Sequence, residues 1–270
     1  MLKIIEVRCN YQKGRIVVQD LPQISWILES DNRNVVQTAY QIQIARELDF
    51  CHCCYDSNKV ISDQSSGIRP EEFKLEPVTR YYVRVRVWDN KKEESEFSEP
   101  IDFLSPISPS EGWKADFISA EKPESENDSS GVMVRKEICL SRHPKQAWLF
   151  STALGLYEVY VNGERVGEDE MMPGWTSYHK HLLYQSYDVT EILREGKNAL
   201  GALIGAGWYK GKMGFQRFRN LYGKETAFSA ELHLIYEDGT REVLRSDDTF
   251  SGTKAPILFS EIYDGETYDA

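Results

Sequence analysis

Several features that would assign a function directly are absent from this sequence. No apolar run in its 270 residues approaches the roughly 20 residues that a membrane-spanning helix requires. The N-terminal stretch Met1–Arg15 mixes charged residues with short apolar runs, so it lacks the hydrophobic region of a signal peptide. These absences predict a soluble, cytoplasmic protein with no membrane partner.

Cysteine is scarce, and its spacing argues against a disulfide framework. There are five cysteines, three of them in the run Cys51-His52-Cys53-Cys54. Zinc sites need four ligands and usually combine two separated pairs, but no second Cys or His pair lies near this run. His179 and His181, on one face of an expected strand, likewise have no third ligand spaced with them. We therefore expect reduced thiols in a surface turn, no metal and no other cofactor.

Motifs for nucleotide binding and for common hydrolytic mechanisms are also missing. The chain has no Gly-rich phosphate loop, no alternation of strands and helices, no repeat of fixed period and no G-x-S-x-G nucleophile elbow. Its formal net charge of −11 repels phosphate backbones and anionic membrane surfaces. Nucleic acid is therefore not expected as a partner, whereas a neutral ligand such as a sugar is indifferent to this charge.

What the sequence does contain is the pattern of β-strands, beginning with a first sandwich over residues 1–104. Tyr81, Val83, Val85 and Val87 alternate with more polar or aromatic neighbours, which is the period of a half-buried strand. The preceding segment Leu75–Tyr81 has the form of a tyrosine corner in immunoglobulin-like sandwiches. With turn signals at roughly 8–12-residue spacing, this half resembles a fibronectin type III domain. Such a domain usually packs against its neighbouring domains or serves as a spacer between them.

A second β-sandwich is predicted over residues 113–270, after a Pro- and Ser-rich linker at residues 105–112. Tyr157, Val159 and Val161 form an alternating strand, and Asn162-Gly163 supplies the positive φ angles of a type I′ turn. Elsewhere in this half we expect a mobile loop over Glu121–Gly131, a strand over Leu182–Tyr187 and a short helical turn over Glu191–Arg194. The fold class is therefore all-β, with two β-sandwich domains in tandem, the first of them immunoglobulin- or fibronectin-like.

A group of aromatic residues in Gly- or charge-rich loops is the strongest candidate for a binding site. A pyranose ring has an apolar face of C–H groups, which suits an aromatic plane beside hydrogen-bonding side chains. The alternative is that these rings cap a core, since large aromatic side chains are mostly buried. The candidate carbohydrate-binding residues are Trp175, Tyr178, Trp208, Tyr209 and Arg217, with Phe215 and Phe218 nearby.

The C-terminal segment carries four acids, Glu261, Asp264, Glu266 and Asp269. Glycosidases use two carboxyl groups, but a general acid needs an enclosed site that raises its pKa. Because this segment follows a β-sandwich at the end of the chain, we expect solvated loop acids. No catalytic residue is assigned.

The order of motifs in the second half resembles a known family. YVNG, G-W-T at Gly174–Thr176, YDVT, EGKNAL and G-W-Y-x-G at Gly207–Gly211 follow one another as in the N-terminal jelly-roll domain of bacterial family 78 α-L-rhamnosidases. The terminal SEIYDGETYDA is similar to the segment that leaves that domain. The resemblance covers Trp113–Ala270 well and Ile24–Leu104 more loosely. Ala206 departs from it, because the family usually has a polar residue there.

The resemblance implies that this chain is an accessory region and not the hydrolase itself. Family 78 enzymes carry their acidic catalytic residues on a helical barrel that follows the jelly roll, and no such helical repeat occurs here. We expect an inactive fragment that supports the missing C-terminal catalytic barrel and recognises a rhamnose-containing glycan. The alternative is a purely structural or protein-interaction pair of β-sandwiches without a sugar site.

Overall fold

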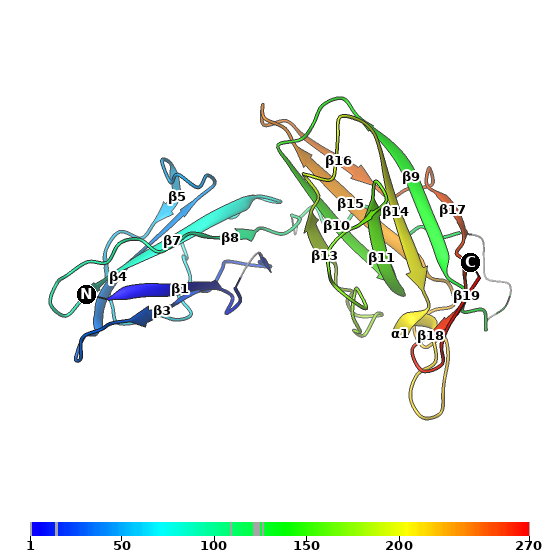
Figure 1. The fold of residues 1–270 in the computed structure, drawn as a ribbon, viewed down its shortest axis with the longest axis horizontal. Coiled ribbons are helices and arrows are strands. Elements are labelled where there is room, and N and C mark those ends of the chain that lie inside the picture. The colour runs from blue at the N-terminus through cyan, green and yellow to red at the C-terminus, as the bar shows by residue number, and fades with distance from the viewer. Residues whose placement is uncertain (1, 14–15, 109, 121–124, 126, 270) are drawn as a thin grey trace. The chain divides into compact units, whose positions relative to one another are not determined.

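A computed structural model describes residues 2–13, 16–108, 110–120, 125 and 127–269, which divide into two compact units between Trp113 and Lys114. The expected all-β architecture of two sandwiches is confirmed (Figure 1). The loop predicted at Glu121–Gly131 includes residues 121–124 and 126, and residue 109 belongs to the predicted linker; these lie outside the described residues. No helix in the described ranges is long and apolar enough to cross a bilayer.

The first unit contains a six-stranded sheet and a two-stranded ribbon. The sheet runs in the order β2-β8-β7-β4-β5, with β6 also paired to β4, and the ribbon joins β1 to β3 (Figure 1). The strands are β1 (Lys3–Cys9), β2 (Ile16–Val17), β3 (Ile24–Glu29), β4 (Gln37–Ala45), β5 (Cys53–Asp56), β6 (Val60–Ile61), β7 (Arg80–Asp89) and β8 (Ile101–Leu104).

The core of this unit follows the alternation read from the sequence. The side chains of Val83, Val85 and Val87 on β7 are fully buried, as is Tyr81 at the start of the strand. The Tyr81 hydroxyl accepts a hydrogen bond of 2.9 Å from the backbone N–H of Glu76, which confirms the tyrosine corner.

The second unit consists of two larger sheets and one small hairpin. A four-stranded sheet has the order β13-β10-β15-β16, and a five-stranded sheet has the order β12-β11-β14-β9-β17 (Figure 1). The elements are β9 (Val132–Leu140), β10 (Gln146–Leu154), β11 (Leu156–Val161), β12 (Glu164–Arg165), β13 (Gln185–Asp188), β14 (Gly196–Gly205), α1 (Gly207–Lys210), β15 (Ala227–Ile235), β16 (Arg241–Arg245), β17 (Ser251–Lys254), β18 (Ile257–Glu261) and β19 (Gly265–Tyr268).

The hairpin β11–β12 forms as the sequence predicts. Asn162 and Gly163 have φ angles of 54° and 87°, the left-handed values that a type I′ turn requires. Tyr157, Val159 and Val161 face the core and are buried. The turn and the alternating burial of β11 both follow the local sequence.

Of three local expectations, two change and the short turn forms. The strand expected at Leu182–Tyr187 begins only at Gln185, because the Leu183 carbonyl accepts a bond from the Thr152 hydroxyl instead of joining the ladder. The helical turn expected at Glu191–Arg194 is a single turn, in which the Val189 carbonyl accepts from two N–H groups. His179 and His181 lie in the loop before β13, so the prediction that they share a strand face is wrong.

Candidate functional site

The aromatic residues picked out in the sequence gather where three segments meet. The loop at residues 174–179, helix α1 and the loop at residues 220–223 bring five rings together. We call this group the aromatic cluster; it consists of Trp175, Tyr178, Trp208, Tyr209 and Tyr222. Four of these residues were predicted as site residues, and the structure brings them into one place.

The ring geometry of the cluster is that of mutually supporting pairs. The indoles of Trp175 and Trp208 have centroids 6.3 Å apart and planes inclined by only 12°. Tyr178 packs against Tyr209 at 5.3 Å and against Tyr222 at 4.9 Å. These separations lie in the range in which aromatic pairs stabilise one another. The cluster therefore holds its rings in fixed orientations.

The rings of the aromatic cluster differ in their exposure to solvent. Trp175 is 58% exposed, whereas Trp208, Tyr178 and Tyr209 are half-buried. Burial raises the pKa of Tyr178 to about 12. Tyr209 also packs closely, since a Cβ added to Gly223 would lie 2.1 Å from its hydroxyl oxygen. Trp175 is thus the ring that faces solvent, and it is held by Trp208 and Tyr222.

Polar groups of the cluster lie beside the Trp175 ring. The indole Nε1 of Trp175 donates to the Tyr222 hydroxyl at 3.2 Å, and His179 Nε2 lies 3.0 Å from the Tyr222 carbonyl oxygen. The Tyr222 hydroxyl accepts a hydrogen bond from the indole and can still donate its own proton to another acceptor. Our sequence analysis missed Tyr222, although its position before Gly223 resembles that of the other aromatic residues beside glycine.

Arg217 lies outside the cluster and contacts a different part of the molecule. Its guanidinium pairs with Asp264 in the turn between β18 and β19, and Lys212 pairs with the same carboxylate. Phe215 and Phe218 occupy the same loop and are exposed, Phe215 completely. The loop at residues 212–218 is therefore joined to the C-terminal hairpin rather than to the rings around Trp175.

The acidic segment also differs from expectation, because Glu261 is buried and not solvated. Its side chain is paired with Arg219 and accepts bonds from the Ser129 hydroxyl at 2.5 Å and the Lys212 N–H at 2.7 Å. The Lys212 hydrogen bond and the Arg217 charge lower the pKa of Asp264. Both carboxylates are thus occupied in holding β18–β19 against the loop after helix α1, and Glu261 also against Ser129. The turn at Ile262–Asp264 lies below α1 in Figure 1.

The cysteines and histidines do not assemble into a ligand set. Among the residues that the structure describes, no group of three His, Cys, Asp or Glu side chains is placed to hold a metal ion. Cys51, Cys53 and Cys54 are exposed around the start of β5, whereas burial raises the pKa of Cys9 to about 12.

Two family models match the chain, one in each unit. Residues 4–104 match the Rha78A-like N-terminal immunoglobulin domain, and residues 142–270 match the α-L-rhamnosidase N-terminal domain. The boundary between the two units, after Trp113, lies in the gap at residues 105–141 between the two matches.

Relatives of the whole chain are longer proteins. An α-L-rhamnosidase of Formosa agariphila is 32% identical over 295 residues, covering 98% of this chain but 31% of that protein. The crystal structure of native α-L-rhamnosidase from Aspergillus terreus aligns with a TM-score of 0.91 at 30% identity, over 99% of this chain and 31% of its own. That of the Dictyoglumus thermophilum α-L-rhamnosidase aligns at 0.87 and 32% identity, over 99% and 31%. This chain spans about a third of the length of the relatives it matches.

Proposed function

The chain belongs to the family 78 α-L-rhamnosidases as their N-terminal, non-catalytic region, and we propose that it recognises rhamnose-containing carbohydrate through the aromatic cluster. We also propose that it supports the catalytic part of a longer enzyme that hydrolyses terminal α-L-rhamnose. The exposed Trp175 ring, held parallel to Trp208, is the observation that carries the first proposal.

A single exposed ring on a rigid base suits one face of a sugar. The C–H groups of a pyranose stack on the Trp175 indole, and the ring loses little freedom on binding because Trp208 already fixes its plane. The Tyr222 hydroxyl, beside the indole nitrogen, donates to a sugar oxygen. The electrically neutral ligand is unaffected by the net charge of −11.

A second surface of the same unit fits the supporting role. Phe215, Phe218, Ile262 and Tyr263 are exposed on the loop after α1 and on the adjoining hairpin turn, and the Arg217–Asp264 ion pair joins these segments. Exposed apolar groups gathered in this way mark a protein contact. Because the relatives are about three times as long as this chain, we propose that their catalytic portion covers this surface in the longer enzyme.

The test of recognition is a titration of the 270-residue chain with L-rhamnose and rhamnose-containing oligosaccharides, followed by tryptophan fluorescence. We expect saturable binding that the Trp175→Ala variant loses. Phe117→Ala removes another exposed aromatic ring of the same unit and should leave binding unchanged. Circular dichroism of each variant verifies that the fold is retained.

A purely structural pair of sandwiches is the alternative. It is favoured by the half-burial of Trp208 and Tyr209, which also serve packing. Absence of binding at tens of millimolar sugar, about tenfold above the 1 mM scale of weak affinity, would refute carbohydrate recognition. Support of the catalytic part would then be the one role that is still proposed. Equal loss of binding in Phe117→Ala would refute the assignment to Trp175.

A further inference from the structure

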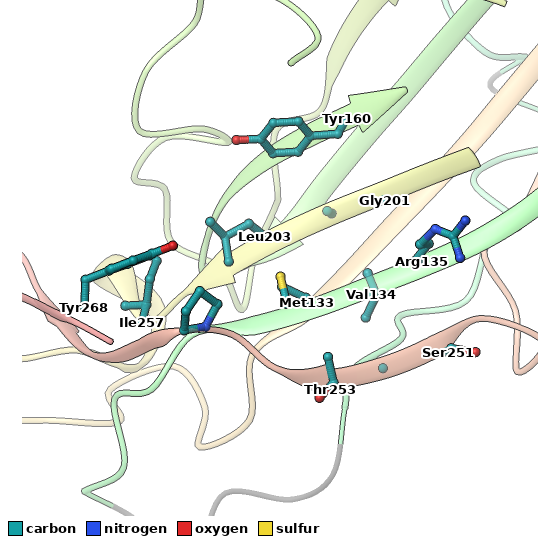
Figure 2. A pocket seen from close by; sticks show the side chains of 13 residues that line it. Met133, Val134, Arg135, Tyr160, Gly201, Leu203, Ser251, Thr253, Ile257 and Tyr268 are labelled. Atoms are coloured by element: carbon teal, nitrogen blue, oxygen red, sulfur yellow. The ribbon is translucent and has the colours of Figure 1, made fainter. Parts of the chain in front are cut away.

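A groove of about 550 Å³ crosses the outer face of the five-stranded sheet in the second unit, and none of the residues that line it belongs to the aromatic cluster. Met133 on β9, Leu203 on β14 and Tyr160 on β11 project into it (Figure 2). Their strand neighbours Val134 and Ala202 point the other way, into the core, and are buried. The side chains that project into the groove are therefore those of the outward-facing strand positions.

The C-terminal hairpin closes one end of this groove. Tyr268 of β19 and Ile257 of β18 form the wall there, and Tyr160 stands on the opposite side of Leu203 in Figure 2. Two aromatic rings thus flank an aliphatic floor.

Gly201 keeps the floor of the groove low. It lies in the middle of β14, in register with Arg135 on β9 and with Tyr160 on β11. A Cβ added at this position would lie 3.2 Å from the Val134 carbonyl oxygen. Glycine weakens a strand interior and often marks a place where another group approaches the backbone closely. Here the missing side chain leaves the space between Tyr160 and Arg135 open.

The chemistry of the lining selects against a sugar. The Tyr160 hydroxyl donates to Glu158 Oε2 at 2.6 Å, and the Arg135 guanidinium pairs with Glu137 at 2.9 Å. Sugar hydroxyls would meet mostly carbon there and lose hydrogen bonds to water without replacement, which is costly. An aromatic ring needs few such partners and gains from contact with tyrosine faces and with the Met133 thioether.

We propose that this groove binds a neutral, planar aromatic molecule of one or two fused rings. Its volume lies within the range of about 300–1,000 Å³ that holds small organic ligands. The net charge of −11 disfavours an anionic ligand. This site is independent of the carbohydrate site proposed above and shares no residue with it.

The test uses 2-naphthol as the probe and methionine methyl groups as reporters. The chain has five methionines, so [¹³C-methyl]methionine labelling gives few, separable signals. Met133 reports on the groove, and Met171, whose carbonyl accepts from the Gly174 N–H just before Trp175, reports on the aromatic cluster. We expect 2-naphthol to shift the Met133 signal saturably and to leave Met171 unmoved, whereas L-rhamnose leaves Met133 unmoved.

Two variants of the C-terminal hairpin provide a matched pair. Tyr268 and Tyr263 are similarly exposed, at 61% and 58%, but only Tyr268 lines the groove. Tyr268→Ala should weaken the response of Met133 at least tenfold, and Tyr263→Ala should leave it unchanged.

Four results would overturn the proposal. No shift of Met133 at millimolar 2-naphthol would show that the groove takes no aromatic ligand. Equal weakening by both variants would show that the response comes from the hairpin as a whole. A shift of Met133 with L-rhamnose would make the groove a sugar site. Dependence of the Met133 signal on protein concentration without probe would show that a second copy of the chain occupies it.

Discussion

The Glu261→Gln substitution is expected to release the C-terminal hairpin β18–β19 from the loop that follows helix α1 and from Ser129. The Glu261 side chain is buried and receives three donors: Arg219, the Ser129 hydroxyl and the Lys212 N–H. Glutamine has nearly the same shape, so the change removes a charge and one acceptor oxygen without leaving a cavity. Packing is thereby held constant, and the electrostatic contribution is isolated.

The magnitude follows from the donors that lose a partner. Arg219 pairs with Oε1 of Glu261 and the Lys212 N–H bonds Oε2, and a glutamine amide keeps only one of these two oxygens, so one of the two donors loses its acceptor. Breaking a buried ion pair by removing one partner costs about 3–5 kcal/mol, and the Arg219 side chain is 15% exposed, which favours the lower end. We expect the free energy of opening the hairpin to fall by about 3 kcal/mol, which is roughly a 100-fold rise in the population of the open form.

Native-state hydrogen exchange of the amides in residues 261–269 measures this opening. Exchange should accelerate roughly 100-fold in Glu261→Gln, and urea unfolding reports how far the loss is shared by the whole unit. Glu266→Gln, an exposed acid on β19, should change stability by less than about 0.5 kcal/mol. The double variant Glu261→Gln/Arg219→Met should cost less than the sum of its parts, because no charge is left buried. Exchange in Glu261→Gln within twofold of the parent protein would refute the reasoning.

Two further predictions concern the cores of the units. Tyr81→Phe removes the acceptor of the Glu76 N–H and should destabilise the first unit by about 1 kcal/mol, as measured by urea unfolding. An unchanged unfolding midpoint would argue against the tyrosine corner as a stabilising element. Burial by itself raises the pKa of Glu231, but the hydrogen bond from His233, a backbone N–H and the charge of Arg245 lower it below the usual value of 4.5. A lowered pKa in the folded state means that this stabilisation is present above about pH 4.5 and is lost as the pH falls through the folded-state pKa. Stability of Glu231→Gln measured from pH 7 to pH 3 should therefore fall less steeply than that of the parent, and equal slopes would contradict it.

Several features of the fold could be predicted because they depend on neighbours in the sequence. Asn162-Gly163 encodes its turn through the φ angles that these two residues tolerate, and the alternation around Val83 and Val85 encodes which face of β7 is buried. The aromatic residues beside glycine at Trp175 and Trp208 were recognisable as a group for the same reason.

The candidate site could be predicted only in part, because its remaining members come from distant segments. Tyr222 joins the cluster through a hydrogen bond to Trp175, 47 residues earlier, and no local pattern shows that pairing. Arg217 carries the charge expected of a sugar-binding residue, but Asp264, also 47 residues away, holds it elsewhere. The sequence shows which residue types suit a given chemistry, whereas the tertiary fold decides which of these residues lie close together.

The acids of the C-terminal segment show most clearly which features depend on local sequence and which depend on the tertiary structure. The sequence by itself determined that the chain forms two β-sandwiches, since period-2 alternation and turn residues act over a few positions. It also carried the motifs of the rhamnosidase N-terminal domain in their order. Only the tertiary structure decided that Glu261 is buried, because its partner Ser129 lies 132 residues away. It likewise created the groove above Gly201, because that space exists only where four strands and the C-terminal hairpin come together.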